Sequence, residues 1–169
     1  MLSRLSTQAL FLGVFVFCCG LMATGYYMQY VLDMEPCALC MTQRVFIVLA
    51  GLIALIACLH NPRGLGIKVY SIAIALSAVA GSCFSMRQLY LQSLPPDQAP
   101  ACGPSISYIL ETFPLNKALT LMLKGDGNCA ETLWTFLGIS IPGWTLVAFG
   151  MIICCCLYLA FRGSNDRHP

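Results

Sequence analysis

Charged side chains are scarce in this sequence and make up only 9% of its 169 residues. A typical soluble domain is about 25% charged, whereas 59% of the residues here are hydrophobic. This shortage excludes an ordinary soluble domain and indicates an integral membrane protein. Because a spanning helix takes about 20 residues, we expect some four spans and one substantial loop, packed as a single domain over residues 1–169.

The sequence also lacks a strong net charge. Its formal charge is +2 at pH 7, and its basic residues are not clustered. Nucleic-acid binding needs a dense basic patch or stripe, so the sequence predicts no nucleic-acid partner.

Four long apolar runs separate the few charged segments. The first run carries no charge, and Arg4 before it supplies the basic start of a secretory signal peptide as an alternative interpretation. The run is longer than the apolar part of a usual signal peptide and shows no small-x-small cleavage site, so we expect a retained helix. The predicted spans cover residues 9–32, 41–59, 66–90 and 144–161.

Two segments between these runs are expected to lie on the same side of the membrane. They are the short segment 33–40 and the long, polar-rich segment 92–142. Residues 114–123 are amphipathic and too short to span, so they either lie flat in the membrane interface or pack on the bundle as a short helix. The expected fold class is therefore all-α: an integral membrane four-helix bundle with two outward loops, the second carrying a short interfacial helix.

The charges predict the orientation of the chain. Four spans put both termini and the turn at 60–66 on one side, which carries five basic residues and one acid, namely Arg4, Arg63, Lys68, Arg162, Arg167 and Asp166. The positive-inside rule then places both termini in the cytoplasm. Loops 33–40 and 92–142 would face outward, which in a bacterium is an oxidising compartment where disulfides persist.

The eleven cysteines fall into two groups. Seven lie in apolar runs without charged neighbours, where cysteine behaves as a small hydrophobe: Cys18, Cys19, Cys58, Cys83, Cys154, Cys155 and Cys156. The other four lie in the outward segments, and an even number on an oxidising side indicates two disulfides. Proximity in sequence makes Cys37–Cys40 one pair and leaves Cys102–Cys129 as the other.

Three interpretations of the outward cysteines are open. Two structural disulfides would explain Cys102–Cys129, but the small loop closed by Cys37–Cys40 would stabilise little. A zinc site fits the C-x-x-C half, but Cys102 and Cys129 are 27 positions apart and neither histidine is on the outward side. The third interpretation is thiol–disulfide exchange between two redox-active pairs, and no metal is then predicted.

The surroundings of Cys40 favour exchange. This residue follows Pro36 and Cys37 near the expected start of a helix, where unpaired N–H groups favour thiolate over thiol. Arg44 is four residues later and shares the helical face, so a permanent positive charge would lie beside the sulfur. The alternative for Arg44 is an interfacial arginine that snorkels to headgroups or pairs with Glu35.

Three groups of residues together form a specific pattern. They are Pro36-Cys37-x-x-Cys40 with Arg44; Cys102-Gly103-Pro104 followed by Tyr108, Glu111 and Phe113-Pro114-Leu115; and Cys129-Ala130-Glu131 followed by Trp134, Phe136-Leu137-Gly138 and Pro142-x-Trp144. This pattern resembles the bacterial disulfide bond formation protein B family. The resemblance covers nearly the whole chain, from the first apolar run to the last.

The resemblance implies an inner-membrane enzyme that reoxidises a periplasmic thioredoxin-fold dithiol oxidase (DsbA-like) and passes electrons to membrane quinone, either ubiquinone or menaquinone. The active cysteines would be periplasmic and both termini cytoplasmic. Carried onto this chain, it implies that Cys102 forms the mixed disulfide with the partner and that Cys129 then attacks Cys37. Cys40 would be released as the thiolate that meets the quinone, with Arg44 stabilising the charge.

The chain departs from some relatives near the expected quinone site. Gln43 stands where some relatives carry an acid, and no histidine lies near the outer end of the third apolar run. Arg87, Gln88 and Gln92 are candidates for the hydrogen-bond donor that is missing there.

Two other functions are open. A vitamin K epoxide reductase-type enzyme also couples thiols to quinone, but its C-x-x-C lies in a later helix, whereas here the motif precedes the second apolar run. The other is a small membrane protein stapled by disulfides and without enzymatic activity. Labelling of free thiols before and after a reduced partner is added separates a disulfide staple from a redox relay, because the cysteines of a staple stay oxidised while those of a relay turn over.

Overall fold

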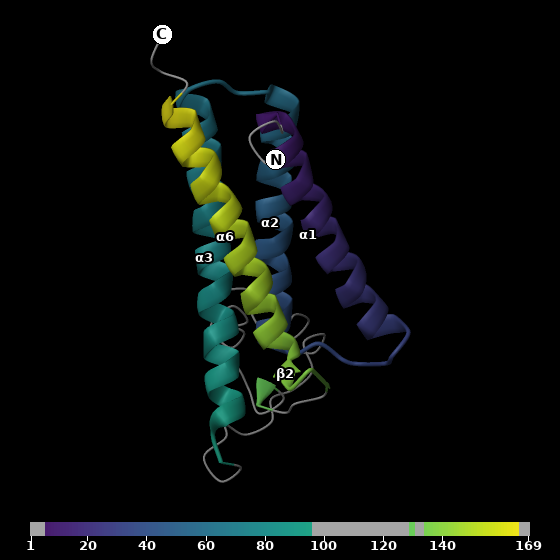
Figure 1. Ribbon diagram of the computed structural model, residues 1–169. Coiled ribbons are helices and arrows are strands. Elements are labelled where there is room, and N and C mark those ends of the chain that lie inside the picture. Colours follow the sequence, from purple (N-terminus) through teal and green to yellow (C-terminus); the bar gives the residue numbers. More distant parts are fainter. Residues whose placement is uncertain (1–5, 96–128, 131–133, 166–169) are drawn as a thin grey trace, which may run out of the picture.

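The computed structural model describes residues 6–95, 129–130 and 134–165. Within these ranges it contains four long helices: α1 Thr7–Tyr30, α2 Ala38–His60, α3 Leu65–Ser93 and α6 Ile141–Asn165 (Figure 1). Each of them is long and apolar enough to cross a membrane. The predicted fold class, an all-α membrane bundle of four helices, is confirmed. The expected interfacial helix at 114–123 lies outside the described residues.

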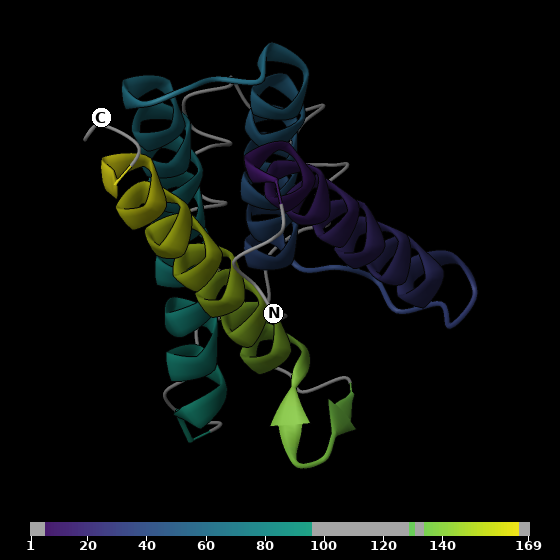
Figure 2. The same cartoon turned by 45° about the horizontal axis from the view of Figure 1, so that its top comes forward.

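A short hairpin that the sequence did not indicate precedes α6. Strand β1, Thr135–Phe136, pairs antiparallel with β2, Ile139–Ser140, so that Phe136 lies opposite Ile139. The turn residues Leu137 and Gly138 have φ angles of 53° and 78°. Both angles are positive, as a tight hairpin turn requires. Figure 2 shows the hairpin beside the first turn of α6.

The helices pack in a defined order around α3. This helix packs extensively on both α2 and α6, α2 packs on α1, and α1 contacts α6 only sparsely. Figure 1 shows α1 diverging from α6 toward the end of the bundle that carries the hairpin. The α2–α3 turn, the start of α1 and the end of α6 lie at the opposite end.

Small residues bring the helices close together. Ala50, Ala54 and Ala57 of α2 are fully buried, and Phe11 and Phe149 fill the space around the small residues. In lipid, close van der Waals contact between small residues holds helices together, because the surrounding acyl chains remove most of the hydrophobic drive. The outer faces carry exposed apolar side chains suited to lipid contact, among them Val16, Val45, Leu76 and Leu157.

We expect Gly81→Ala to destabilise the bundle by about 1–3 kcal/mol, the usual range for overpacking. A Cβ atom at Gly81 would lie 2.2 Å from Cζ of Phe149, whose side chain is 1% exposed and has no room to move. Gly13→Ala is the matched control, since a Cβ there meets nothing within 4 Å. Thermal unfolding in detergent should show a lower midpoint for Gly81→Ala alone, and equal midpoints would contradict the packing argument.

Candidate active site

The C-x-x-C pair lies where α2 begins. Cys37 is the N-cap residue, with extended backbone at φ −72° and ψ 170°, and its carbonyl accepts from the backbone N–H of Met41 at 3.1 Å. Cys40 therefore lies in the first turn of α2, just before the expected start of the span at residue 41. The Cys37 thiol donates a hydrogen bond to Sγ of Cys40 at 3.1 Å. Both side chains are half-buried, so the two sulfurs form one partly exposed dithiol.

A third cysteine packs against the first. Cys129 is fully buried in a cluster with Leu39 and Leu91, and Cys37 packs on the same cluster. A side-chain hydrogen bond joins Cys129 to Cys37. This bond, followed by the one with Cys40, raises the pKa of the Cys37 thiol well above its usual range. Cys37 therefore stays protonated at neutral pH, which suits it to donate to Cys40.

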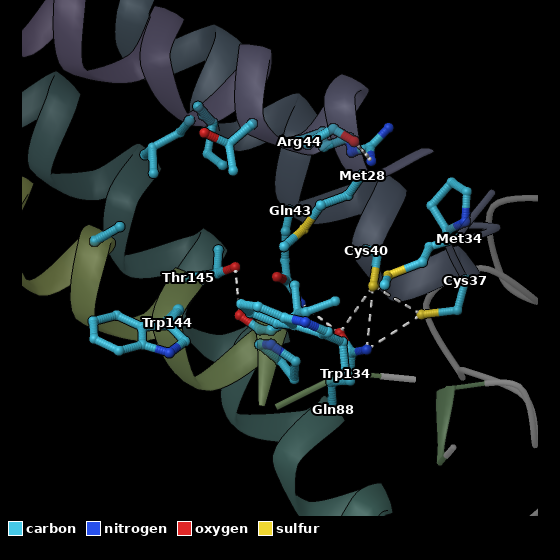
Figure 3. Close-up of a pocket in the computed structure, with 18 of the residues that line it drawn as sticks. Met28, Met34, Cys37, Cys40, Gln43, Arg44, Gln88, Trp134, Trp144 and Thr145 are labelled. Carbon is cyan, nitrogen blue, oxygen red and sulfur yellow. Dashed lines mark hydrogen bonds between the residues drawn. The ribbon is translucent and has the colours of Figure 1, made fainter. Parts of the chain in front are cut away.

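Two glutamines connect α2 and α3 at the dithiol. Nε2 of Gln88 lies 3.3 Å from Sγ of Cys37 and 3.2 Å from Sγ of Cys40, so this amide contacts both sulfurs (Figure 3). Oε1 of Gln88 accepts from Nε2 of Gln43 at 2.8 Å. Both glutamine side chains are 3% exposed, and buried amides of this kind require partners.

Arg44 is held by α1. Its Nη2 donates to the carbonyl oxygen of Gly25 at 2.9 Å, and its Nη1 donates to Oε1 of Gln29. Its guanidinium carbon also lies 5.5 Å from the ring centroid of Tyr26, which is within cation–π range. The described contacts of Arg44 therefore fix a permanent positive charge between α1 and α2.

An apolar cavity of about 410 Å³ lies beside the dithiol. Its polar lining includes Cys37, Cys40, Gln43, Arg44 and Gln88, and Figure 3 shows these side chains around one space. Its apolar lining comes mainly from α1 and α6: Phe17, Leu21, Met28, Val147, Ala148 and Met151. A mostly apolar cavity of this size with a few polar groups is typical of a small-molecule site.

Aromatic side chains of the hairpin close one side of this cavity. Trp134 and Phe136 stack with ring centroids 5.7 Å apart and planes 3° apart, and Trp144 lies 6.0 Å from Phe136. Nε1 of Trp144 donates to the carbonyl oxygen of Phe136 at 3.1 Å, which attaches the hairpin to α6. The sequence indicated Trp134 and Trp144 only as members of the residue pattern, because nothing local shows that they line a cavity.

The structure brings together some of the predicted site residues and not others. Cys37, Cys40, Cys129, Arg44 and Gln88 lie in or next to one site. Gln92 also lines the cavity. Arg87 is exposed and is not among the cavity residues. Cys102 lies outside the described residues.

The contacts of Arg44 were missed by sequence reasoning. Gly25, Tyr26 and Gln29 lie in an uncharged apolar run, and no local motif marks them as partners of an arginine on the next helix. The only hint of these contacts in the sequence was that Gln29 is a polar residue near the end of that apolar run.

The arrangement can carry out thiol–disulfide chemistry next to a small-molecule cavity. Three sulfur atoms lie in a row in space: that of Cys129 contacts that of Cys37, and that of Cys37 contacts that of Cys40. Exchange between such sulfurs proceeds by thiolate attack on a disulfide. A donor amide and a guanidinium lie near the last sulfur, where negative charge would be left.

Comparison with known proteins agrees with this chemistry. The family model for disulfide bond formation protein DsbB matches residues 7–159. The chain is 53% identical over 145 residues to disulfide bond formation protein B of Hahella chejuensis, covering 86% of this chain and 88% of that protein. It is 49% identical over 154 residues to the protein of the same name from Marinobacter nauticus, covering 91% and 92%.

A third relative, disulfide bond formation protein B of Saccharophagus degradans, is 51% identical over 149 residues, covering 88% of this chain and 90% of its own. Together with four helices that can cross a membrane, these matches establish a multi-pass membrane protein with the enzymatic role of a thiol oxidoreductase in disulfide formation. The chain belongs to the disulfide bond formation protein B (DsbB) family.

Proposed function

We propose that this chain is a thiol:quinone oxidoreductase of the bacterial inner membrane that reoxidises a periplasmic DsbA-like dithiol oxidase. The observation that carries the proposal is the dithiol Cys37–Cys40, which lines an apolar cavity while Cys129 packs against its other side. Cys37 is thus suited to receive electrons from the thiol of Cys129, and Cys40 is suited to pass them to an apolar acceptor in the cavity.

The relay starts at the pair Cys102–Cys129. A thiolate of the partner attacks Cys102, so that the Cys102–Cys129 bond breaks, a mixed disulfide forms and Cys129 is released as a thiolate. Cys129 then attacks Cys37: the Cys129–Cys37 bond forms, the Cys37–Cys40 bond breaks, and the electron pair stays on the sulfur of Cys40. The packing of Cys37 on the buried cluster that contains Cys129 supports this step, because it keeps the two sulfurs adjacent.

The residues around the cavity fit a quinone ring. The lining is mostly apolar, and Arg44, Gln43 and Gln88 supply a small number of polar groups beside Cys40. When bound, quinone, either ubiquinone or menaquinone, supplies a two-electron acceptor. Arg44 would hold positive charge near the sulfur, and the aromatic side chains of the hairpin would exclude water. The cavity lies between α1 and α6, whose sparse contact leaves a route from the bilayer.

The proposed orientation follows from charge. The end of the bundle with the α2–α3 turn carries Arg63 and Lys68, so it is assigned to the cytoplasm. The end with the dithiol would face the periplasm, where a soluble thiol oxidase reaches it.

One reconstitution assay tests the function. The purified protein should oxidise a reduced thioredoxin-fold dithiol oxidase only when a quinone analogue is present, with one quinone consumed per disulfide formed. Cys40→Ser is the matched negative control, because it keeps Cys37, Cys102 and Cys129 but removes the proposed final thiolate. Oxidation of the partner without quinone, or no oxidation at all by the intact protein, would refute the proposal.

The seven cysteines in the helices should be dispensable for turnover. Cys18, Cys58 and Cys156 are buried and Cys19, Cys83 and Cys154 are exposed on the helices, while Cys155 is intermediate. We expect each single Cys→Ala variant to keep turnover within about twofold of the unmodified protein, because surface and conservative changes away from a site cost little. The measurement is the reconstitution assay at matched protein yield. A large loss from any one variant of normal yield would contradict the assignment.

A further inference from the structure

Gln88 is a buried amide near the end of α3, next to the dithiol at the start of α2. Its side chain is 3% exposed, and its neighbours along the buried face of α3 are small residues such as Gly81 and Ser85. A buried amide needs partners for its carbonyl oxygen and for its NH2 group. The partners here are Gln43 and the two sulfurs of the dithiol.

Gln43 determines which way the Gln88 amide points. Nε2 of Gln43 donates to Oε1 of Gln88 at 2.8 Å, which is the shortest of the contacts around this amide. With Oε1 held by this donor, Nε2 is the end of the amide closer to the sulfurs: it lies 3.3 Å from Sγ of Cys37 and 3.2 Å from Sγ of Cys40, whereas Oε1 accepts from the Cys40 thiol at the longer distance of 3.5 Å. An amide turned the other way would present an oxygen to the sulfurs, and an oxygen acceptor would oppose a negative charge there.

We propose that Gln88 is a catalytic residue that stabilises the Cys40 thiolate, and that Gln43 is the positioning residue that keeps its NH2 group directed at the sulfur. This inference rests on the dithiol relay proposed above. When the Cys129–Cys37 bond forms and the Cys37–Cys40 bond breaks, the electron pair remains on Cys40. The N–H of Gln88, with Nε2 3.2 Å from that sulfur, donates to the anion and no proton is transferred.

The energetic reason is the change in charge of the acceptor. A hydrogen bond to an ionised acceptor is roughly twice as strong as one between neutral groups. Gln88 therefore stabilises the thiolate more than it stabilises the disulfide or the thiol. The same amide is not available to hold a quinone oxygen, because both its ends are already engaged. This assigns Gln88 to the sulfurs rather than to the acceptor.

The test measures the dithiol alone. In a Cys102→Ser, Cys129→Ser background, the equilibrium between reduced and oxidised Cys37–Cys40 is measured against dithiothreitol and glutathione buffers, without quinone and without partner. Gln88→Leu should shift this equilibrium about tenfold toward the disulfide, which is about 30 mV for a two-electron couple. Gln43→Leu should shift it in the same direction by a smaller factor. Ser85→Ala is the matched control, since Ser85 is buried on the same helix and its hydroxyl donates to the carbonyl oxygen of Gly81 rather than to either sulfur of the dithiol.

A second readout is the rate at which Cys40 is alkylated at neutral pH in the reduced protein. This rate should fall about tenfold in Gln88→Leu and be unchanged in Ser85→Ala. Gln88→Met, which keeps the length of the side chain, gives the same measurement if the Leu variant folds poorly. An equilibrium and an alkylation rate within twofold of the parent, in either Gln88 variant, would overturn the inference.

The two proposals fail in different ways. If the intact protein does not reduce quinone but the Gln88 variants still shift the equilibrium, the proposed function is wrong and the role of Gln88 is not. If the variants lose quinone turnover with no shift in the equilibrium, Gln88 holds the acceptor and the present inference is wrong.

Discussion

Supplied with the oxidised form of the partner oxidase, the Cys129→Ser variant should accumulate a mixed disulfide through Cys102, and the Cys102→Ser variant should form no adduct. In the proposed relay Cys102 receives the partner, and Cys129 passes the electrons on by attacking Cys37. In Cys129→Ser the unpaired Cys102 thiolate attacks the disulfide of the oxidised partner, so that the mixed disulfide forms and the partner's second cysteine leaves as a thiolate. No Cys129 thiolate is then present to resolve this adduct into a Cys102–Cys129 bond. If the two cysteines were only a structural staple, both variants would behave alike and neither would trap the partner.

The packing of Cys129 gives a physical reason for this asymmetry. Its side chain is fully buried and hydrogen-bonded to Cys37, so it lies where a resolving thiolate must be. The same bond is the largest cause of the raised pKa of Cys37. In Cys129→Ser the bonding partner is changed to a hydroxyl, so the pKa of Cys37 should fall toward its usual range. More of Cys37 is then thiolate at pH 8, and its alkylation should become faster.

Two measurements check the pair of variants. A non-reducing gel with the oxidised partner should show the adduct for Cys129→Ser and none for Cys102→Ser. Mass mapping of alkylated peptides at pH 8 reports the reactivity of Cys37 in the reduced protein. Cys83→Ala serves as the matched cysteine control, because Cys83 is exposed on α3 outside the cavity. Absence of an adduct from Cys129→Ser would rule out its role as the resolving residue.

Much of the fold could be predicted because the membrane imposes simple rules. Uncharged runs of about 20 residues must be helical to satisfy their backbone in lipid. The turn between α2 and α3 was predicted at residues 60–66, and Asn61 is the C-cap residue of α2, in the left-handed region with φ 47°. The hairpin before α6 could not be predicted, because its turn uses Leu137 at positive φ, and leucine is not a residue that marks such a turn.

In the site, too, features set by one stretch of sequence could be predicted, whereas contacts between distant residues could not. Cys37, Cys40 and Arg44 belong to one helix start, so their spacing alone indicated a dithiol with a nearby charge. The contacts of Gln88 with these sulfurs join residues 51 and 48 positions apart on different helices. No local period or motif carries such information. Gln88 was therefore predicted only as a candidate donor for quinone, whereas its contacts with the two sulfurs lead us to propose that it donates to Cys40.

Arg44→Ala should lower quinone-dependent turnover by about 100-fold, the lower end of the effect of removing one preorganised electrostatic group. It should leave formation of the mixed disulfide with the partner unchanged, because Arg44 lies in the cavity beside Cys40. Arg44→Lys should recover part of the loss, since lysine keeps the charge but not the planar fork that reaches both Gly25 and Gln29.

The structure adds a second consequence of removing Arg44, which is the loss of a clamp between α2 and α1. Gln29→Leu separates the two effects, because it removes one α1 contact of Arg44 and leaves the positive charge in place. If charge is decisive, Gln29→Leu should lower turnover only a few-fold, with most of the change in the apparent affinity for quinone. Initial rates over a range of quinone concentrations, with adduct formation on a gel as the parallel readout, measure both. Equal losses in Gln29→Leu and Arg44→Ala would show that the clamp, rather than the charge, sustains turnover.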